Sequence, residues 1–92
     1  MQLIVEFLGH SRRLANAREA VVRVGDAASY RDVLRQVAAD FPALLGPLIV
    51  PHSFGLVPSY MLNVDGRRVV SDLDASPEDG QRLIFMFVEA GG

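Results

Sequence analysis

The segment RLIFMFVEAGG, residues 82–92, runs from the most apolar stretch of the chain directly into two glycines. Residues 82–88 predict a strand, because large apolar side chains occupy both of its faces. Gly91 and Gly92 form no turn, since no second element follows them, and we expect a flexible C-terminal tail. At an average glycine usage of about 7 %, roughly one chain in 200 ends in such a pair by chance. We therefore expect the tail to be functional, with its carboxylate on the slimmest peptide that a chain can build.

The first 24 residues predict an antiparallel hairpin. Residues 2–8 and 19–24 each alternate between apolar and other side chains, which is the pattern of a half-buried strand. The apolar face of the first strand consists of Leu3, Val5 and Phe7. The intervening residues 9–16 are polar and basic and are predicted as a loop, with Leu14 tucked under the sheet.

One main helix is predicted after this hairpin. Ser29 is placed to cap its first turn, with Asp32 as the capping-box partner three residues on. Apolar side chains then recur at helical spacing, at Tyr30, Val33, Leu34, Val37, Ala38 and Phe41. Pro42 ends the helix, because proline has no N–H group to continue the ladder.

The second half of the chain predicts the remaining strands. Residues 60–64 form a strand, Asp65-Gly66 is a type I′ hairpin signal, and residues 67–70 are the short return strand. Residues 71–81 are rich in turn signals and lead into the final strand. The proline-rich residues 43–59 predict short turns and a well-packed loop rather than a long regular element.

This order of elements predicts an α+β fold. A lone helix after a hairpin crosses one face of the sheet, and the right-handed crossover rule lets the first and last strands lie side by side and parallel. We expect a mixed sheet of four to five strands in one domain, residues 1–88, followed by the tail, residues 89–92. The predicted core consists of Leu3, Val5, Phe7, Val22, Val33, Leu34, Val37, Leu83 and Phe85.

Composition excludes several functional classes. Half of the 92 residues are hydrophobic and 22 % are charged, which is typical of a globular chain. The net charge of −2 gives no basic surplus for binding nucleic acid. Residues 1–6 lack the basic start of a secretory signal, and the uncharged stretch 41–64 is too rich in proline for a membrane helix, so we expect a cytoplasmic protein.

The titratable residues indicate no catalytic or metal centre of the chain's own. Without cysteine there is no disulfide, thiolate metal site or cysteine nucleophile. His10 and His52 are too few for a structural zinc site, and the acidic residues of the 72–79 stretch are expected to be solvated loop charges. All nine basic residues are arginine, so the chain has no lysine side chain to accept an isopeptide bond.

The element order and the tail together resemble the β-grasp, or ubiquitin-like, fold, and more narrowly the MoaD/ThiS family of sulfur carriers. The resemblance spans nearly the whole chain. The matching residues are Val5-Glu6-Phe7-Leu8-Gly9, Arg12-Arg13-Leu14-Ala15, Tyr30-Arg31-Asp32-Val33-Leu34, Asn63-Val64-Asp65-Gly66, Glu78-Asp79-Gly80 and Ala90-Gly91-Gly92. The Asp-Gly turn, the apolar last strand and the terminal glycines at this spacing are its most specific parts.

The resemblance implies a carrier that is not catalytic alone and binds no cofactor itself. A ubiquitin-activating-like enzyme, using ATP and magnesium, adenylates the Gly92 carboxylate, and Gly91 lets the tail enter that active site. A persulfide donor then converts the carboxylate to a thiocarboxylate. A sulfur-accepting enzyme, such as the large subunit of molybdopterin synthase, uses that sulfur as a nucleophile. The resemblance is greatest to the MoaD-like small subunit of that synthase.

A partner-binding surface is expected beside the base of the tail. One helix covers only one face of the sheet, so Ile84 and Met86 of the last strand, with Ile4 beside them, predict an exposed apolar patch on the other. The predicted contact residues are Ile4, Ile84, Met86, Val88, Glu89 and Ala90. The alternative is that residues 43–59 fold over this face.

Three classes of function remain open on the sequence. The first is a sulfur carrier, for molybdopterin or instead for thiamine, cysteine, methionine or thionucleoside synthesis. The second is a ubiquitin-like modifier that joins Gly92 to lysines of target proteins. The third is a β-grasp binding module without tail chemistry.

Overall fold

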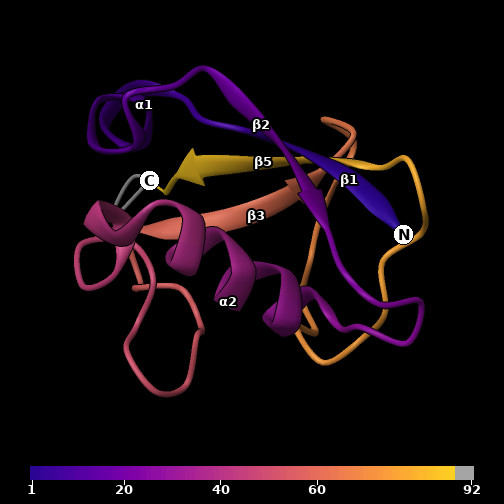
Figure 1. Cartoon of the computed structure of the whole chain (residues 1–92). Helices are drawn as coiled ribbons and strands as arrows, with labels where there is room; N and C mark the ends of the chain where they lie inside the picture. Colours follow the sequence, from indigo (N-terminus) through magenta and orange to yellow (C-terminus); the bar gives the residue numbers. More distant parts are fainter. Residues whose placement is uncertain (89–92) are drawn as a thin grey trace.

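Five strands form one mixed sheet in the order β2-β1-β5-β3-β4. The computed structural model describes residues 1–88 (Figure 1). Its elements are β1 (Gln2–Glu6), α1 (Gly9–Ala15), β2 (Glu19–Arg23), α2 (Tyr30–Asp40), the 3₁₀ turn η1 (Pro42–Leu44), β3 (Tyr60–Val64), β4 (Arg68–Val69) and β5 (Arg82–Phe87). The strand β1 pairs antiparallel with β2 and parallel with β5, so the predicted pairing of the first and last strands is confirmed.

The two hairpins form where the sequence predicts them. In the first, Leu3 lies opposite Val22 and Val5 opposite Ala20, so the apolar faces of the two strands coincide. In the second, Asp65 and Gly66 both have positive φ angles, 56° and 71°, as a type I′ turn requires. The strand β3 then pairs antiparallel with β5, which places β5 between two partners.

The helix α2 lies across one face of the sheet (Figure 1). Its first turn carries the predicted capping box: the Asp32 N–H donates to Ser29 Oγ at 3.1 Å, and the Ser29 N–H donates to Asp32 Oδ2 at 3.0 Å. The hydrogen bond that the Asp32 carboxylate accepts from the Ser29 N–H is the main reason why the pKa of Asp32 lies below its ordinary value. The cap satisfies N–H groups that have no partner inside the helix, so α2 begins at Tyr30.

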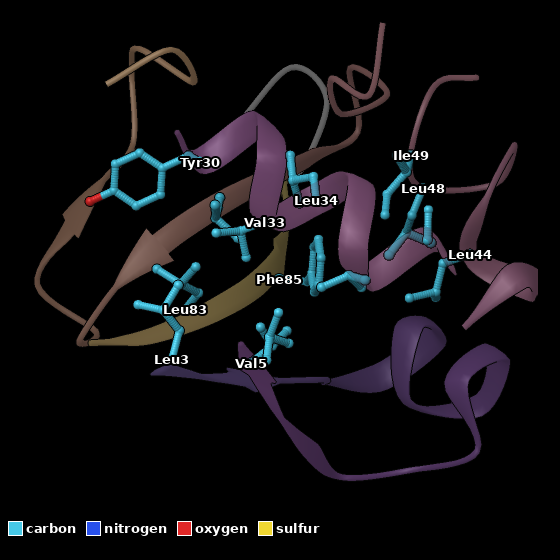
Figure 2. Close-up of a cluster of buried hydrophobic side chains, with 14 of the residues drawn as sticks. Leu3, Val5, Tyr30, Val33, Leu34, Leu44, Leu48, Ile49, Leu83 and Phe85 are labelled. Atoms are coloured by element: carbon cyan, nitrogen blue, oxygen red, sulfur yellow. The ribbon is translucent and has the colours of Figure 1, made fainter. Parts of the chain in front are cut away.

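The core lies between α2 and the sheet, and every residue predicted for it is buried. At its centre the rings of Phe7 and Phe85 stack 5.8 Å apart and nearly parallel, and Phe41 meets the edge of Phe7 at 5.0 Å. Figure 2 shows Phe85 pointing from β5 into the space below α2, close to Val5.

The proline-rich segment, residues 42–59, extends the helical layer. Leu44, Leu48 and Ile49 are fully buried in the same apolar cluster as the α2 residues, and they gather at the C-terminal end of α2 (Figure 2). Arg31 Nη1 donates to the Ser53 carbonyl at 2.8 Å, and the Arg35 guanidinium lies 5.1 Å from the centre of the Phe54 ring. The segment therefore packs on the α2 side, and the alternative in which it covers the opposite face is wrong.

The loop predicted over residues 9–16 is largely a short helix, α1. Ser11 is buried, and its hydroxyl both accepts a hydrogen bond from the Leu8 N–H, at 3.0 Å, and donates to the Leu8 carbonyl, at 2.7 Å. Asn16 ends the helix in the left-handed region, with φ 54°. A helix of seven residues shows no apolar repeat, so its sequence resembles that of a loop.

Candidate functional site

A backbone hydrogen bond at the end of β5 marks the base of the tail. The Val88 N–H donates to the Ser59 carbonyl at 2.7 Å, one residue after β5 ends at Phe87. Glu89, Ala90, Gly91 and Gly92 carry the sequence-predicted chemistry and lie outside the described residues. The described part of the site thus ends at Val88, directly before the tail.

A groove with a volume of about 620 Å³ lies beside this point. Its walls come from the start of α1, the segment before β3 and the end of β5, which meet at one side of the domain (Figure 1). The lining residues are Leu8, Gly9, His10, Pro47, Ser59, Tyr60, Phe85, Met86 and Phe87. The groove thus places an apolar surface directly next to the base of the tail.

Phe87 is the most exposed large apolar residue at the groove. It is 62 % exposed, and its ring meets the edge of Tyr60 at 5.7 Å. The alternation along β5 places Phe87 on the same face as Leu83 and Phe85, yet only those two are buried. Phe87 was not among the predicted site residues, because the alternation of apolar side chains does not indicate where the covering layer stops along the strand. Leu8, which also lines the groove, and Val88, which follows Phe87, are further exposed apolar residues at this end of the domain.

The face of the sheet opposite α2 is the second part of the site, and we call it the open face. Ile4 and Met86 are half-buried on it, whereas Ile84 is only 8 % exposed. The expected exposure of Ile84 is not found, because Ile84 lies on an interior strand between Glu6 of β1 and Asn63 of β3.

The open face is broader than the sequence indicated. Val21, opposite Ile4, is 53 % exposed, and Val69, opposite Asn63, is 48 % exposed. Neither valine belongs to the patch predicted from the sequence. Their place beside it follows from the strand register.

A charged cluster borders the apolar part of the open face. Arg82 Nη1 lies 2.9 Å from Glu19 Oε2 and 3.5 Å from Glu6 Oε2. The hydrogen bond to Glu19 is the main reason why the pKa of Arg82 is raised. Glu6 and Glu19 are opposite each other across the β1–β2 pair, so one guanidinium is shared between two carboxylates and the cluster keeps a negative charge.

The whole chain is similar to several proteins of known structure. No protein-family model and no curated protein matches the chain. Among solved structures, the HVO 2177 protein of Haloferax volcanii is 31 % identical, with a TM-score of 0.79, and the match covers 100 % of this chain and 87 % of that one. SAMP1 of the same organism is 18 % identical, with a TM-score of 0.84, and both chains are covered completely.

A Pyrococcus furiosus protein named "Putative molybdopterin converting factor, subunit 1" is 16 % identical, with a TM-score of 0.76, and the match covers 97 % of this chain and 99 % of that one. The two matches with lower identity show the shared fold, whereas the 31 % match spans the whole chain. The chain belongs to the MoaD/ThiS family of ubiquitin-like β-grasp proteins.

This MoaD/ThiS-type domain has, within residues 1–88, no cluster of three or more histidine, cysteine, aspartate or glutamate side chains that could hold a metal ion. Two acidic residues of the 72–79 stretch, Asp74 and Asp79, have partners in other parts of the domain. Asp74 pairs with Arg31 at 2.8 Å, and Asp79 accepts a hydrogen bond from the Gln2 N–H at 2.6 Å. In the described part of the chain, no helix is both long and apolar enough to cross a membrane.

Proposed function

We propose that this chain is a sulfur carrier whose Gly92 carboxylate is adenylated and converted to a thiocarboxylate. The observation that supports this most is the position of Val88. Its N–H bonds the Ser59 carbonyl at the edge of an exposed apolar groove, and Glu89, Ala90, Gly91 and Gly92 come next in the sequence. A partner that binds the groove receives the tail at the same time.

The proposed chemistry needs no nucleophile from the described domain. A Gly92 carboxylate oxygen attacks the α-phosphorus of ATP, and pyrophosphate leaves. The terminal sulfur of a persulfide then attacks the acyl carbon, and AMP leaves. This gives an acyl disulfide. A second thiolate then attacks its sulfur that is bonded to the donor's carbon. The acyl-bound sulfur leaves as the thiocarboxylate, and the donor ends as a disulfide. The absence of cysteine from this chain fits a scheme in which sulfur sits on the terminal carbonyl carbon.

The residue types after Val88 suit this scheme. Adenylation must occur in a closed site, because water hydrolyses the acyl-adenylate. When extended, the four residues after Val88 reach about 13–14 Å. Gly91 and Gly92 add no side chains and accept backbone angles that other residues avoid, so the tail can enter a narrow channel.

We further propose three partners: a ubiquitin-activating-like adenylating enzyme that uses ATP and magnesium, a persulfide donor, and a sulfur-accepting enzyme. The acceptor we favour is a molybdopterin synthase large subunit. This choice is supported by the similarity to the Pyrococcus furiosus converting factor subunit, which matches over nearly the whole of both chains. Thiamine, cysteine, methionine and thionucleoside synthesis are the alternative destinations of the sulfur.

The second candidate function is that of a protein modifier that joins Gly92 to lysines of other proteins. It is favoured by the similarity to SAMP1, whose full name is small archaeal modifier protein 1. Because this chain contains no lysine, it offers no side-chain amine for building chains of itself. Both functions begin with the same adenylation, so they differ only in the nucleophile that follows.

Intact mass spectrometry of the protein purified from its own cells tests the proposal. We expect a species whose mass ends at Gly92 and a second species in which one oxygen is exchanged for sulfur. Treatment with an alkylating reagent should modify only the second species, because the chain has no cysteine. A chain that extends beyond Gly92, or one that never carries sulfur, would contradict the carrier function. A ladder of heavier lysine conjugates would favour the modifier.

Replacement of Met86 by Asp is expected to weaken binding of the adenylating enzyme by about tenfold or more, since a charge would enter an apolar contact. Met86 is half-buried and lines the groove, so the domain should stay folded. The measurement is titration calorimetry, with circular dichroism to check folding. Ala39→Asp, on the exposed side of α2, adds the same charge elsewhere and should bind normally. Equal affinities of the two variants would exclude Met86 from the interface.

A further inference from the structure

Asn63 is an exception to the rule that buried polar groups are paired. Its side chain is 7 % exposed, and Oδ1 is buried without a hydrogen-bond partner among residues 1–88. It lies on β3 and points to the open face, because its neighbours Leu62 and Val64 belong to the core on the other side. An unpaired buried carboxamide weakens the free domain, so it needs an explanation.

The residues around Asn63 cannot supply the missing hydrogen bond. Ile84 is its partner on β5 and Val69 its partner on β4, and the next residue of β3 on the same face is Met61. None of these side chains carries an N–H or O–H donor. The nearby guanidinium of Arg82 is directed toward β1 and β2, where it bonds Glu19 and contacts Glu6. The amide is therefore enclosed by apolar side chains.

The hairpin next to Asn63 does not need its side chain. The Arg67 N–H donates to the Val64 carbonyl at 3.0 Å, and the Asp65 N–H donates to the Arg82 carbonyl at 2.8 Å. Asp65 Oδ1 in turn accepts from the Arg82 N–H at 2.9 Å. These bonds hold the turn without Asn63, which leaves its side chain without a structural role there.

We propose that Asn63 is a polar anchor that accepts a hydrogen bond from the adenylating enzyme when that enzyme covers the open face; this inference rests on the proposed function. Because Oδ1 makes no bond within the described domain, the carboxamide can turn to present it outward without losing one. The hydrogen bond then fixes the register of a contact that is otherwise apolar and non-directional.

The charges of the open face indicate the chemistry of the surface of the adenylating enzyme that would cover it. The open face presents an unpaired acceptor at Asn63 and, across Ile84, the two carboxylates that share Arg82. Both features call for donors. The matching surface is therefore apolar, with an N–H or O–H donor opposite Asn63 and a cationic side chain opposite Glu19, which is half exposed.

The test compares Asn63→Leu with the wild-type chain. Leucine has the same number of side-chain heavy atoms as asparagine, branches at the same carbon and suits the apolar surroundings, so the melting temperature should stay equal or rise. The affinity for the adenylating enzyme of the same organism, titrated without ATP, should fall by about 10- to 100-fold, because the partner's donor is left unpaired. A purely structural asparagine could not give higher stability together with weaker binding.

Asn63→Asp is the matched control, since a carboxylate of the same shape keeps the acceptor oxygens. Its affinity should stay within a few-fold of the wild type, while its melting temperature falls because a charge is buried. If Asn63→Leu binds normally, Asn63 makes no hydrogen bond to the enzyme that matters for affinity, and the inference fails. If Asn63→Leu unfolds or melts lower, the side chain is structural and the inference fails as well. If the wild-type chain does not bind the enzyme at all, the proposed function fails together with it.

Discussion

Deletion of Gly92 is expected to abolish ATP–pyrophosphate exchange by the adenylating enzyme while the domain remains folded. The proposed reaction occurs at the Gly92 carboxylate, and a chain that ends at Gly91 places its carboxylate about 3.5 Å short of the reacting phosphorus. A misplacement of only about 1 Å can cost on the order of 100-fold in rate. Folding should be unaffected, because the buried core is formed by side chains from Leu3 to Phe85. Exchange kinetics and circular dichroism are the two measurements.

Gly91→Ala is a milder change at the same end of the tail. It keeps the length of the tail and adds one methyl group beside the reacting carboxylate, so exchange should be impaired rather than abolished. Its thermal unfolding should shift little, since substitutions at exposed ends usually stay within about 0.5 kcal/mol. Normal exchange by the Gly92-deleted chain would refute the carrier and the modifier together, because both begin with adenylation of that carboxylate.

Replacement of Phe85 by Ala is expected to cost roughly 3–5 kcal/mol of unfolding free energy. Phe85 is 1 % exposed and stacks on Phe7 at the centre of the core, so truncation leaves a cavity between α2 and the sheet. A small domain has only about 5–15 kcal/mol of stability in total. Urea unfolding should therefore show a midpoint shifted far toward lower denaturant concentration.

Phe87→Ala is the matched control on the same strand and the same face. Phe87 is 62 % exposed and its ring packs against that of Tyr60, so its truncation should cost about 1 kcal/mol or less. The same substitution should nevertheless weaken partner binding, since Phe87 forms the apolar rim of the groove. Equal losses of stability at the two positions would mean that α2 and the segment after it cover β5 more evenly than the structure indicates.

Much of the fold could be predicted because its signals are local. The alternation of Leu3, Val5 and Phe7 defines one face of a strand within a few residues, and the helix start at Ser29 needs only Asp32 three positions on. The Asp65-Gly66 turn is equally local, because its backbone angles depend on the two residues themselves. Each of these features forms in the structure at the predicted place.

Features that depend on distant contacts were missed or misjudged. The helix α1 is held by Ser11 and by packing against the segment that follows α2, and its sequence alone resembles a loop. Leu44, Leu48 and Ile49 complete the core from a proline-rich stretch without a periodic pattern. In both cases the stabilising partner lies elsewhere in the chain, so no window of sequence contains the signal.

For the candidate site, the amino-acid sequence predicts the tail, the apolar last strand that leads to it and the family resemblance, because composition and order along the chain carry that information. The tertiary fold determines which apolar residues are accessible: Ile84 is enclosed, while Phe87 is exposed. It also brought Arg82 between Glu6 and Glu19 and left Asn63 without a partner. Accessibility and pairing depend on strand register and on where the covering layer stops, and both are set by contacts between residues far apart in the sequence.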